Sequence, residues 1–301
     1  MRRIPFVTSA VVLASALSIA TAFATPPTGA PVKYTDYARA QLIESANVPI
    51  VGGTTLVRGS YSVAPGGVSG WRSLPGTTVL AVTKGKLMLH GGEGCAAKDY
   101  AAGQAAVIPA GVYQVHNAGS EPLEFFGAFF GQPKGMTKPL AEGPTEEAPA
   151  GCTEVKAAGA SPSGVSVPTS AAGLFVGSYY SQGATLEIKA GQDIFATQYD
   201  APPGWSSGWF AHYPAVNVME AGDLTYVEAK NGKCDESEVY HAGDSFYHPR
   251  HRHLATTGKD RMVITTIYFG LPHGESLPGP GNQLTAADFS QAPPADCPRL
   301  R

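Results

Sequence analysis

Short runs of apolar residues, separated by turn-forming residues, follow one another along most of the chain. The run Thr78–Val82 stops at Lys84-Gly85-Lys86 and resumes at Leu87–Leu89, which is the pattern of a strand, a tight turn and a second strand. Equivalent runs lie at residues 105–108, 123–126, 216–220, 224–227, 245–248 and 262–265. No long stretch has helical spacing. Many short strands joined by turns therefore predict an all-β sandwich or barrel.

The same series of runs and turns occurs twice, about 140 residues apart. Ser69-Gly70-Trp71 returns as Ser207-Gly208-Trp209, and Phe130–Gly135 returns as Phe269–Gly274. We therefore expect two tandem copies of one β-barrel, related by an internal repeat. The boundaries that follow are residues 25–152 for the first barrel, 153–170 for a linker rich in Pro, Ala, Gly and Ser, and 171–301 for the second barrel.

The N-terminal residues have the pattern of a cleavable signal peptide. Arg2 and Arg3 precede an apolar run at 11–17, and Ala22-Phe23-Ala24 supplies the small residues that a signal peptidase reads. The apolar run is too short to cross a bilayer, which takes about 20 residues. We expect residues 1–24 to be removed, leaving no membrane anchor, and the protein to be secreted to the periplasm or the extracellular medium.

The composition excludes one class of partner. The formal net charge is −3, only 15% of the residues are charged, and no basic run occurs anywhere in the chain. Nucleic-acid binding therefore has no electrostatic basis. The high content of glycine and proline is typical of a turn-rich β protein.

The four cysteines follow the repeat, because Cys95 and Cys234 precede matching turns and Cys152 and Cys297 each close a unit. Four cysteines allow three pairings. The repeat favours Cys95–Cys152 and Cys234–Cys297, which give each barrel its own disulfide in an oxidising compartment. A metal site made of cysteines is the alternative. It is disfavoured because none of them lies in a C-x-x-C motif or has a histidine at ligand spacing.

Two glycine-proline motifs resemble the cupin family. Gly103-x5-Pro109-Ala110-Gly111 matches the start of the second cupin motif, and Gly243-x5-Pro249 matches it in part. The segments from Trp71 and from Trp209 have the length of the first motif. The resemblance covers both units and implies a bicupin with two RmlC-like jelly-roll barrels. Because cupin barrels often pair through their sheets, it also implies that a homodimer can form.

The resemblance implies that only the second barrel keeps metal ligands. In the first unit the ligand positions fall on Arg72, Leu74 and Tyr113, so the metal ligands are lost there. In the second unit Phe210 replaces the first histidine. The expected ligands in that unit are His212, His253 and His251.

The implied cofactor is one divalent transition metal (Fe, Mn, Zn, Ni or Cu), because imidazoles suit all of these ions. One alternative is that residues 249–253 form an exposed polar loop and that His212 is a hydrogen-bonded barrel residue. A metal-free histidine pocket is another. Further candidates for a ligand pocket are Trp205, Asn217, His241, His248, Arg250 and Arg252.

The sequence leaves more than one class of function open. The favoured hypothesis is extracytoplasmic binding of a small molecule without catalysis, because the first unit has lost its ligands and the second is incomplete. The alternative is a metal-dependent enzyme of the oxygenase, decarboxylase or isomerase type that uses the second barrel. A protein–protein or envelope-associated module is a third class of function, and no feature of the sequence supports it.

Overall fold

The structure, a computed structural model, describes residues 28–92, 95–152, 165–176, 183–230, 233–250, 252–275 and Cys297. The predicted signal peptide and the predicted ligand His251 lie outside the described residues. Within them the chain is almost entirely β, with a single one-turn helix. In the described part of the chain no helix is long and apolar enough to span a membrane.

The first half of the chain contributes ten strands and one short helix. The strands are β1 (Lys33–Leu42), β2 (Ala46–Pro49), β3 (Thr55–Val63), β4 (Arg72–Leu74), β5 (Thr78–Lys84), β6 (Lys86–Gly91), β7 (Lys98–Ala101), β8 (Gln104–Ile108), β9 (Gly111–His116) and β10 (Leu123–Gln132). The helix α1 (Pro139–Glu142) follows them.

The second half repeats this series strand for strand. Its strands are β11 (Val165–Phe175), β12 (Thr185–Ile188), β13 (Asp193–Ala201), β14 (Ser206–Ala211), β15 (Ala215–Ala221), β16 (Asp223–Lys230), β17 (Lys233–His241), β18 (Asp244–His248), β19 (Arg252–Thr257) and β20 (Met262–Leu271). The predicted apolar runs all lie in strands. Residues 165–170, assigned to the linker from sequence, form the first part of β11.

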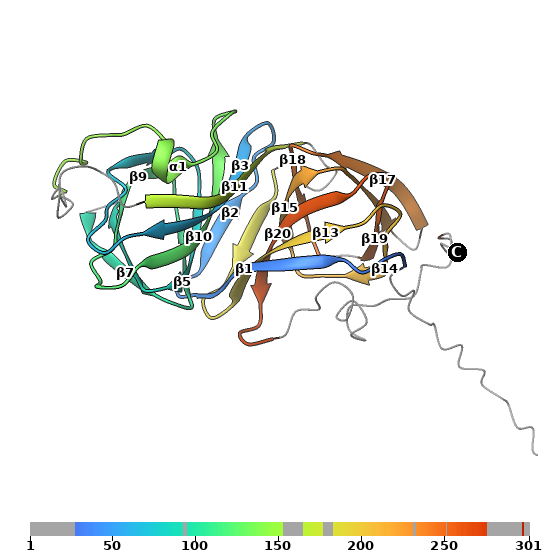
Figure 1. Ribbon diagram of the computed structural model, residues 1–301, viewed down its shortest axis with the longest axis horizontal. Coiled ribbons are helices and arrows are strands. Elements are labelled where there is room, and N and C mark those ends of the chain that lie inside the picture. The colour runs from blue at the N-terminus through green and yellow to red at the C-terminus, as the bar shows by residue number, and fades with distance from the viewer. Residues whose placement is uncertain are drawn as a thin grey trace, which may run out of the picture.

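Each half of the chain gives its first strand to the other half. β1 pairs along its length with β13, and β11 pairs along its length with β3. Figure 1 shows β1, in blue, among the strands of the second half, and β11, in yellow-green, among those of the first. The exchange joins the two inner sheets into one closed ring, in the order β1-β13-β20-β15-β18-β11-β3-β10-β5-β8.

Two four-stranded sheets cover the ring. The sheet β4-β9-β6-β7 faces one half of the ring to form barrel 1, and β14-β19-β16-β17 faces the other half to form barrel 2. A third apolar core fills the ring between the barrels. Ring strands such as β5 and β15 are therefore buried on both faces, which explains why their sequences are continuous apolar runs rather than alternating ones.

The helix α1 closes one end of barrel 1. Leu140 of α1 packs into the core of this barrel. The buried Arg72 side chain holds the following segment, since it donates hydrogen bonds to the carbonyls of Ala141, at 3.3 Å, and Gly143. Arg72, which stands at a metal-ligand position of the cupin motif, thus has a structural role in this chain.

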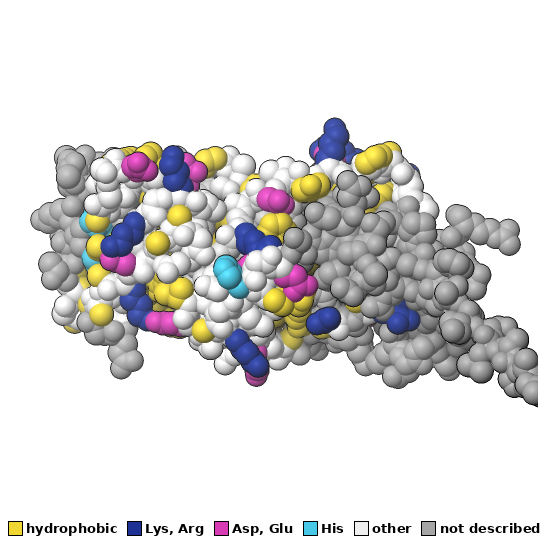
Figure 2. Space-filling model, turned by 90° about the horizontal axis from the view of Figure 1, so that it is seen from below, with side chains coloured by type: hydrophobic (Ala, Val, Ile, Leu, Met, Phe, Trp, Pro, Cys, Tyr) yellow, Lys and Arg dark blue, Asp and Glu magenta, His cyan; other side chains and the backbone are white. Residues whose placement is uncertain are grey.

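The described surface carries no large block of one charge on the face shown in Figure 2. Lysine and arginine side chains are scattered there, several of them beside aspartate or glutamate. Exposed ion pairs such as Lys86–Asp99 and Lys98–Glu44 belong to this mixed surface.

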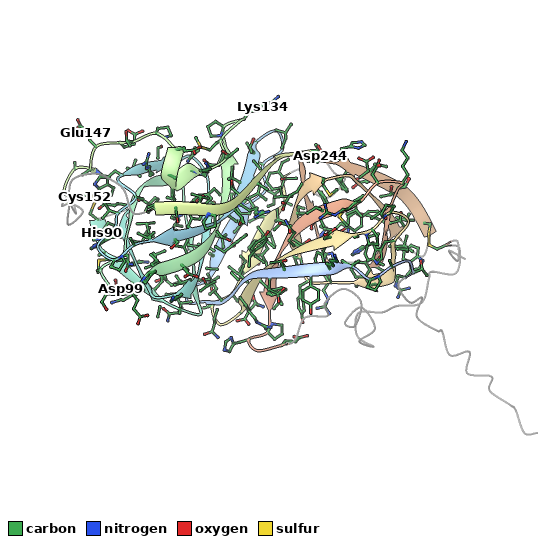
Figure 3. All side chains as sticks on the ribbon, viewed as in Figure 1. His90, Asp99, Lys134, Glu147, Cys152 and Asp244 are labelled. Atoms are coloured by element: carbon green, nitrogen blue, oxygen red, sulfur yellow. A yellow bond between two sulfur atoms is a disulfide. The ribbon has the colours of Figure 1, made fainter. Side chains whose placement is uncertain are left out.

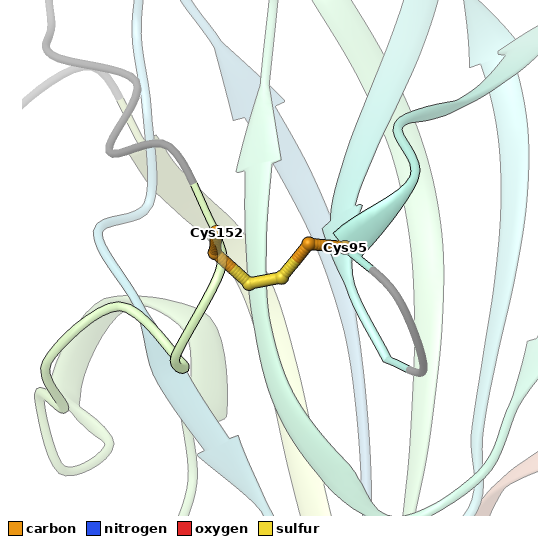
Figure 4. The surroundings of a disulfide bond; sticks show 2 residues. All are labelled: Cys95 and Cys152. Carbon is orange, nitrogen blue, oxygen red and sulfur yellow. A yellow bond between two sulfur atoms is a disulfide. The ribbon is translucent and has the colours of Figure 1, made fainter.

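Each barrel has its own disulfide. Cys95 is bonded to Cys152, and Cys234 to Cys297, as the repeat predicted. Figure 3 places Cys152 at the far end of barrel 1, and Figure 4 shows its bond to Cys95. The prediction of an all-β fold with two tandem jelly-roll barrels and one disulfide in each is confirmed.

Candidate metal centre in barrel 2

Three histidines meet at one end of barrel 2, from three different strands or turns. His212 lies in the turn between β14 and β15, His248 ends β18, and His253 is the second residue of β19. β14 and β19 are neighbours in the outer sheet, while β18 belongs to the ring opposite. The side chains therefore approach one another across the interior of the barrel.

The three imidazoles are close together and buried. Their ring centroids are separated by 4.2 Å for His248–His253, 4.7 Å for His212–His253 and 5.2 Å for His212–His248. Each offers a ring nitrogen, and these atoms all lie within 4.8 Å of one another. The exposed fractions are 6%, 1% and 0% for His212, His248 and His253. No other cluster of this kind occurs among the described residues.

Hydrogen bonding fixes one of the rings. His212 Nδ1 lies 2.5 Å from the carbonyl oxygen of Tyr213. A carbonyl only accepts, so Nδ1 carries the proton and Nε2 is the nitrogen with the lone pair. This is the usual arrangement by which a backbone carbonyl orients a histidine ligand and sets its tautomer.

A buried carboxylate completes the group. Glu228 on β16 is 7% exposed, and its Oε1 lies 3.3 Å from His248 Nε2. Its backbone pairs directly with His253 across the outer sheet. A glutamate at this place can orient an imidazole by accepting its proton or supply an oxygen ligand.

Aromatic rings form the walls around the histidines. Phe210 packs edge-on against His253 at 4.2 Å, Tyr226 stacks on His248 at 4.7 Å, and Tyr268 lies 5.3 Å from His212. Burial raises the pKa of Tyr226 and Tyr268 far above the usual range, so both remain neutral phenols. The polar cluster therefore lies in apolar surroundings.

The turn that carries His212 is tied to neighbouring loops. The Tyr213 hydroxyl donates to Glu275 at 2.9 Å, and the guanidinium of the exposed Arg250 lies 5.1 Å from the centre of the Tyr213 ring. Arg252 begins β19 and is half-buried. Of the two arginines predicted from sequence, Arg250 is the one with a described contact to the histidine turn.

Other sequence candidates lie away from the cluster. Trp205 is buried at the start of β14 and packs in the core of barrel 2, with its backbone bonded to Thr257. Asn217 is buried on β15, where its side-chain oxygen accepts a hydrogen bond from Thr266 at 2.8 Å. His241 is 64% exposed and pairs with Asp223. The structure does not bring His241 to the three histidines.

Sequence reasoning did not single out Glu228. Its signal is the alternation along β16, where Leu224, Tyr226 and Glu228 all point inward and Thr225 and Val227 do not. A glutamate in phase with two large apolar residues on one strand indicates a buried carboxylate. From the sequence, His248 is a candidate for the ligand pocket and a possible replacement for a missing metal ligand, and the structure places it in the cluster.

Barrel 1 has other residues at the corresponding places. In matching register, Leu74 stands for His212, Ile108 for His248, Tyr113 for His253 and Gly91 for Glu228. The first three of these barrel 1 residues belong to its apolar core.

No known protein-family profile matches the sequence, and no curated protein matches it. Among solved structures, the chain is similar to oxalate decarboxylase from Bacillus subtilis at pH 4.6, with 13% identity, 82% of this chain and 78% of that chain covered, and a TM-score of 0.34. It is also similar to AerE from Microcystis aeruginosa, with 14% identity, 74% and 97% covered, and a TM-score of 0.28. At these values, the argument for a site rests on the chain's own residues.

Proposed function

We propose that the protein is an extracytoplasmic bicupin whose second barrel holds one divalent transition-metal ion and binds a small molecule there. The ligands would be His212, His248 and His253. The observation that carries the proposal is the convergence of three buried imidazoles, with ligand atoms within 4.8 Å of one another. The two disulfides support an oxidising, extracytoplasmic location.

The donor set suits such an ion. Imidazole nitrogens bind Zn, Fe, Mn, Ni and Cu, and a site with three protein ligands and an open position is the usual arrangement for a reactive metal. Three imidazoles packed together among aromatic rings lose their hydration, which is costly for polar groups. An ion that accepts a lone pair from each ring would offset this cost.

The small molecule would carry an oxygen donor or a carboxylate. Arg250 lies beside the histidine turn and is exposed, so its guanidinium is free to meet an anion from solvent. The aromatic walls would hold the rest of the molecule by apolar contact. The bound ion would act as a Lewis acid toward the oxygen donor of the small molecule.

A metal-dependent enzyme is the second candidate, and Glu228 favours it. A carboxylate that lies 3.3 Å from a ligand nitrogen and is 7% exposed can hold or move a proton next to a bound molecule. The reaction would be of the oxygenase, decarboxylase or isomerase type.

The decisive experiment measures metal content by elemental analysis. The purified protein is incubated with first-row divalent metals other than copper, desalted and compared with His212→Ala and His253→Ala variants. We expect about one equivalent of metal in the wild type and less than about a tenth of that in either variant. His241→Ala, which removes an exposed histidine outside the cluster, is the matched control and should keep its metal.

Two results would count against the proposal. Metal retained by both cluster variants would remove the histidines from the site, and no metal in the wild type would leave a metal-free binding pocket. If the protein binds metal as expected, small carboxylic acids are screened by calorimetry with the metal-loaded protein. Turnover that disappears in Glu228→Gln while the metal stays bound would favour the enzyme; binding without turnover would favour the binder.

A further inference from the structure

A second pair of histidines lies on the outer face of barrel 1. His90 is on β6 and His116 on β9, and these strands are neighbours in the outer sheet. Their chain neighbours Leu89 and Val115 point into the barrel core. Because side chains alternate along a strand, the two histidines face away from the core and toward the outside of the sheet.

The two rings are close enough to share a ligand. Their centroids are 5.9 Å apart, with an angle of 35° between the planes. Two imidazoles that hold one ion at nitrogen distances of about 2.0–2.1 Å have ring centroids roughly 5–6 Å apart. The observed separation is at the upper end of that range, before any adjustment by a bound ion.

One nitrogen of each ring lacks a partner among the described residues although it is buried. His90 Nε2 and His116 Nδ1 each expose less than 1 Å² and make no hydrogen bond there. A buried polar atom without a partner costs about 1–3 kcal/mol, so each such atom calls for a water or an ion. One ion between the rings would satisfy both nitrogens together.

The surroundings keep the pair in the ligand form. Burial lowers the pKa of both histidines, and the neighbouring His116 lowers that of His90 further, while Asp99 acts against the shift. Lys86, which lies on the same face as His90, is paired with Asp99 at 2.5 Å. Both imidazoles are therefore neutral at pH 7, with a lone pair available.

A thioether lies next to the pair. Met88 is on the same face of β6 as His90 and stands directly opposite His116 in the sheet register. Side chains in such directly opposed positions have Cβ atoms about 4.5–5.5 Å apart. Figure 3 shows His90 and Asp99 at the same end of the molecule as Cys152, on the far side of barrel 1 from barrel 2.

The histidine pair is specific to barrel 1. At the corresponding places on β16 and β19, barrel 2 has Val227 and Thr256. The tryptophans Trp71 and Trp209, in contrast, are buried in both barrels. The repeated fold requires the tryptophan and does not require the histidines.

We propose that His90, His116 and Met88 form a copper site on the outer face of barrel 1. Two imidazoles bind Cu(II) more tightly than the other first-row divalent ions, and the thioether adds a soft ligand for Cu(I). This site is independent of the metal proposed for barrel 2, because it uses the opposite face of a different sheet. It gives the protein a place to bind copper in an oxidising compartment.

The test is a copper titration of the full protein carrying His253→Gln. This substitution removes one proposed metal ligand from barrel 2 and so weakens copper binding there. Cu(II) is added against a competing chelator, and the bound ion is examined by electron paramagnetic resonance. We expect about one equivalent, with hyperfine splitting from two nitrogens. His90→Gln and His116→Gln should each lower the affinity at least about tenfold, and His241→Gln should leave it unchanged. Unfolding curves check that each variant is folded.

The Cu(I) form tests the thioether. Met88→Leu keeps the volume of the side chain and removes the sulfur, so it should lower Cu(I) affinity about tenfold and leave Cu(II) affinity nearly unchanged. Copper binding that survives His90→Gln together with His116→Gln would overturn the proposal, as would the absence of binding in the starting protein. Equal Cu(I) affinity with and without the sulfur would overturn the assignment of Met88.

Discussion

The two barrels have the same strands in the same register, yet within the described residues the cluster of three histidines occurs in barrel 2 alone. In barrel 1 the places that match His212, His248, His253 and Glu228 are taken by Leu74, Ile108, Tyr113 and Gly91, in that order. The backbone around them is alike. Four side chains therefore distinguish the buried polar cluster of barrel 2 from the corresponding places of barrel 1.

Tyr113 is the residue that fills the space in barrel 1. A Cβ added at Gly91 would lie 2.8 Å from its ring, and one added at Gly111 would lie 2.9 Å from it. The glycines are needed because the phenol ring lies directly against both of them. Barrel 1 therefore has a densely packed core at the places where barrel 2 has its histidines and glutamate.

The outer faces differ in the opposite sense. Barrel 1 places His90 and His116 outside its sheet, and barrel 2 has Val227 and Thr256 there. In barrel 2 this outer face carries an apolar cluster of Trp209, Leu254 and Cys297. The histidine group therefore lies inside the barrel in barrel 2 and on the outer face of the sheet in barrel 1.

Placing the barrel 1 residue in barrel 2 should have the largest effect. His253→Tyr removes a central ligand and introduces the ring that fills barrel 1, so we expect metal affinity to fall by about 100-fold or more. Metal titration with a competing chelator measures it. His241→Tyr, outside the cluster, should bind as the wild type does, and an unchanged affinity in His253→Tyr would show that barrel 2 holds its metal without this residue.

Gly91 and Gly111, which lie against the Tyr113 ring, should not tolerate a side chain. Gly91 has φ 127°, and an added Cβ would lie 2.4 Å from the Val112 carbonyl oxygen. We expect Gly91→Ala to destabilise the protein by about 3 kcal/mol. Gly103→Ala is the control: φ is 83° there and nothing lies within 4 Å, so only backbone strain of about 1 kcal/mol applies. Urea unfolding compares the two; equal losses would refute the tight packing.

A histidine in barrel 1 should not restore a site by itself. Tyr113→His leaves Leu74 and Ile108 without ligand atoms, so the metal content attributed to barrel 2 should stay the same. The smaller, polar ring should cost about 2 kcal/mol of stability through a cavity and loss of apolar contact. Elemental analysis and thermal unfolding measure the two effects. A second equivalent of metal in this variant would show that the barrels differ less than their side chains indicate.

The smallest expected effect concerns acid sensitivity on the barrel 2 side. Asp193 is 1% exposed and accepts hydrogen bonds from Arg39 and His273, each at 2.7 Å, where barrel 1 has Thr55. Burial alone would raise the pKa of Asp193, but these bonds lower it overall. The stabilisation is therefore complete above the unfolded pKa of about 3.9 and is lost as the pH falls through the lower folded value.

This linkage can be measured by urea unfolding between pH 6 and pH 3. The wild type should lose up to about 1 kcal/mol more over that range than Asp193→Asn. Asp36→Asn, at an exposed position of β1, serves as the control and should follow the wild type. Parallel curves for the wild type and Asp193→Asn would mean that the Arg39 and His273 contacts add nothing in the folded protein.

The sequence alone was sufficient for the fold class, the repeat and the disulfides. Short apolar runs, turn residues and a repeat predict an all-β protein of two barrels, and the positions of Cys95, Cys152, Cys234 and Cys297 in that repeat predict the disulfides, which the structure confirms. These features follow from local patterns, because side-chain alternation and chain order are properties of the sequence itself.

Tertiary structure alone decided which polar groups meet. Glu228 lies beside His253 because β16 pairs with β19, and His248 approaches both because β18 lies on the ring side of barrel 2, opposite that sheet. No local spacing encodes either arrangement. The exchange of β1 and β11 was also decided by the tertiary structure. Each of these strands would bury the same apolar face whether it paired within its own half of the chain or with the other half. Contacts between strands far apart in the chain depend on how the sheets close, and closure is a property of the whole fold.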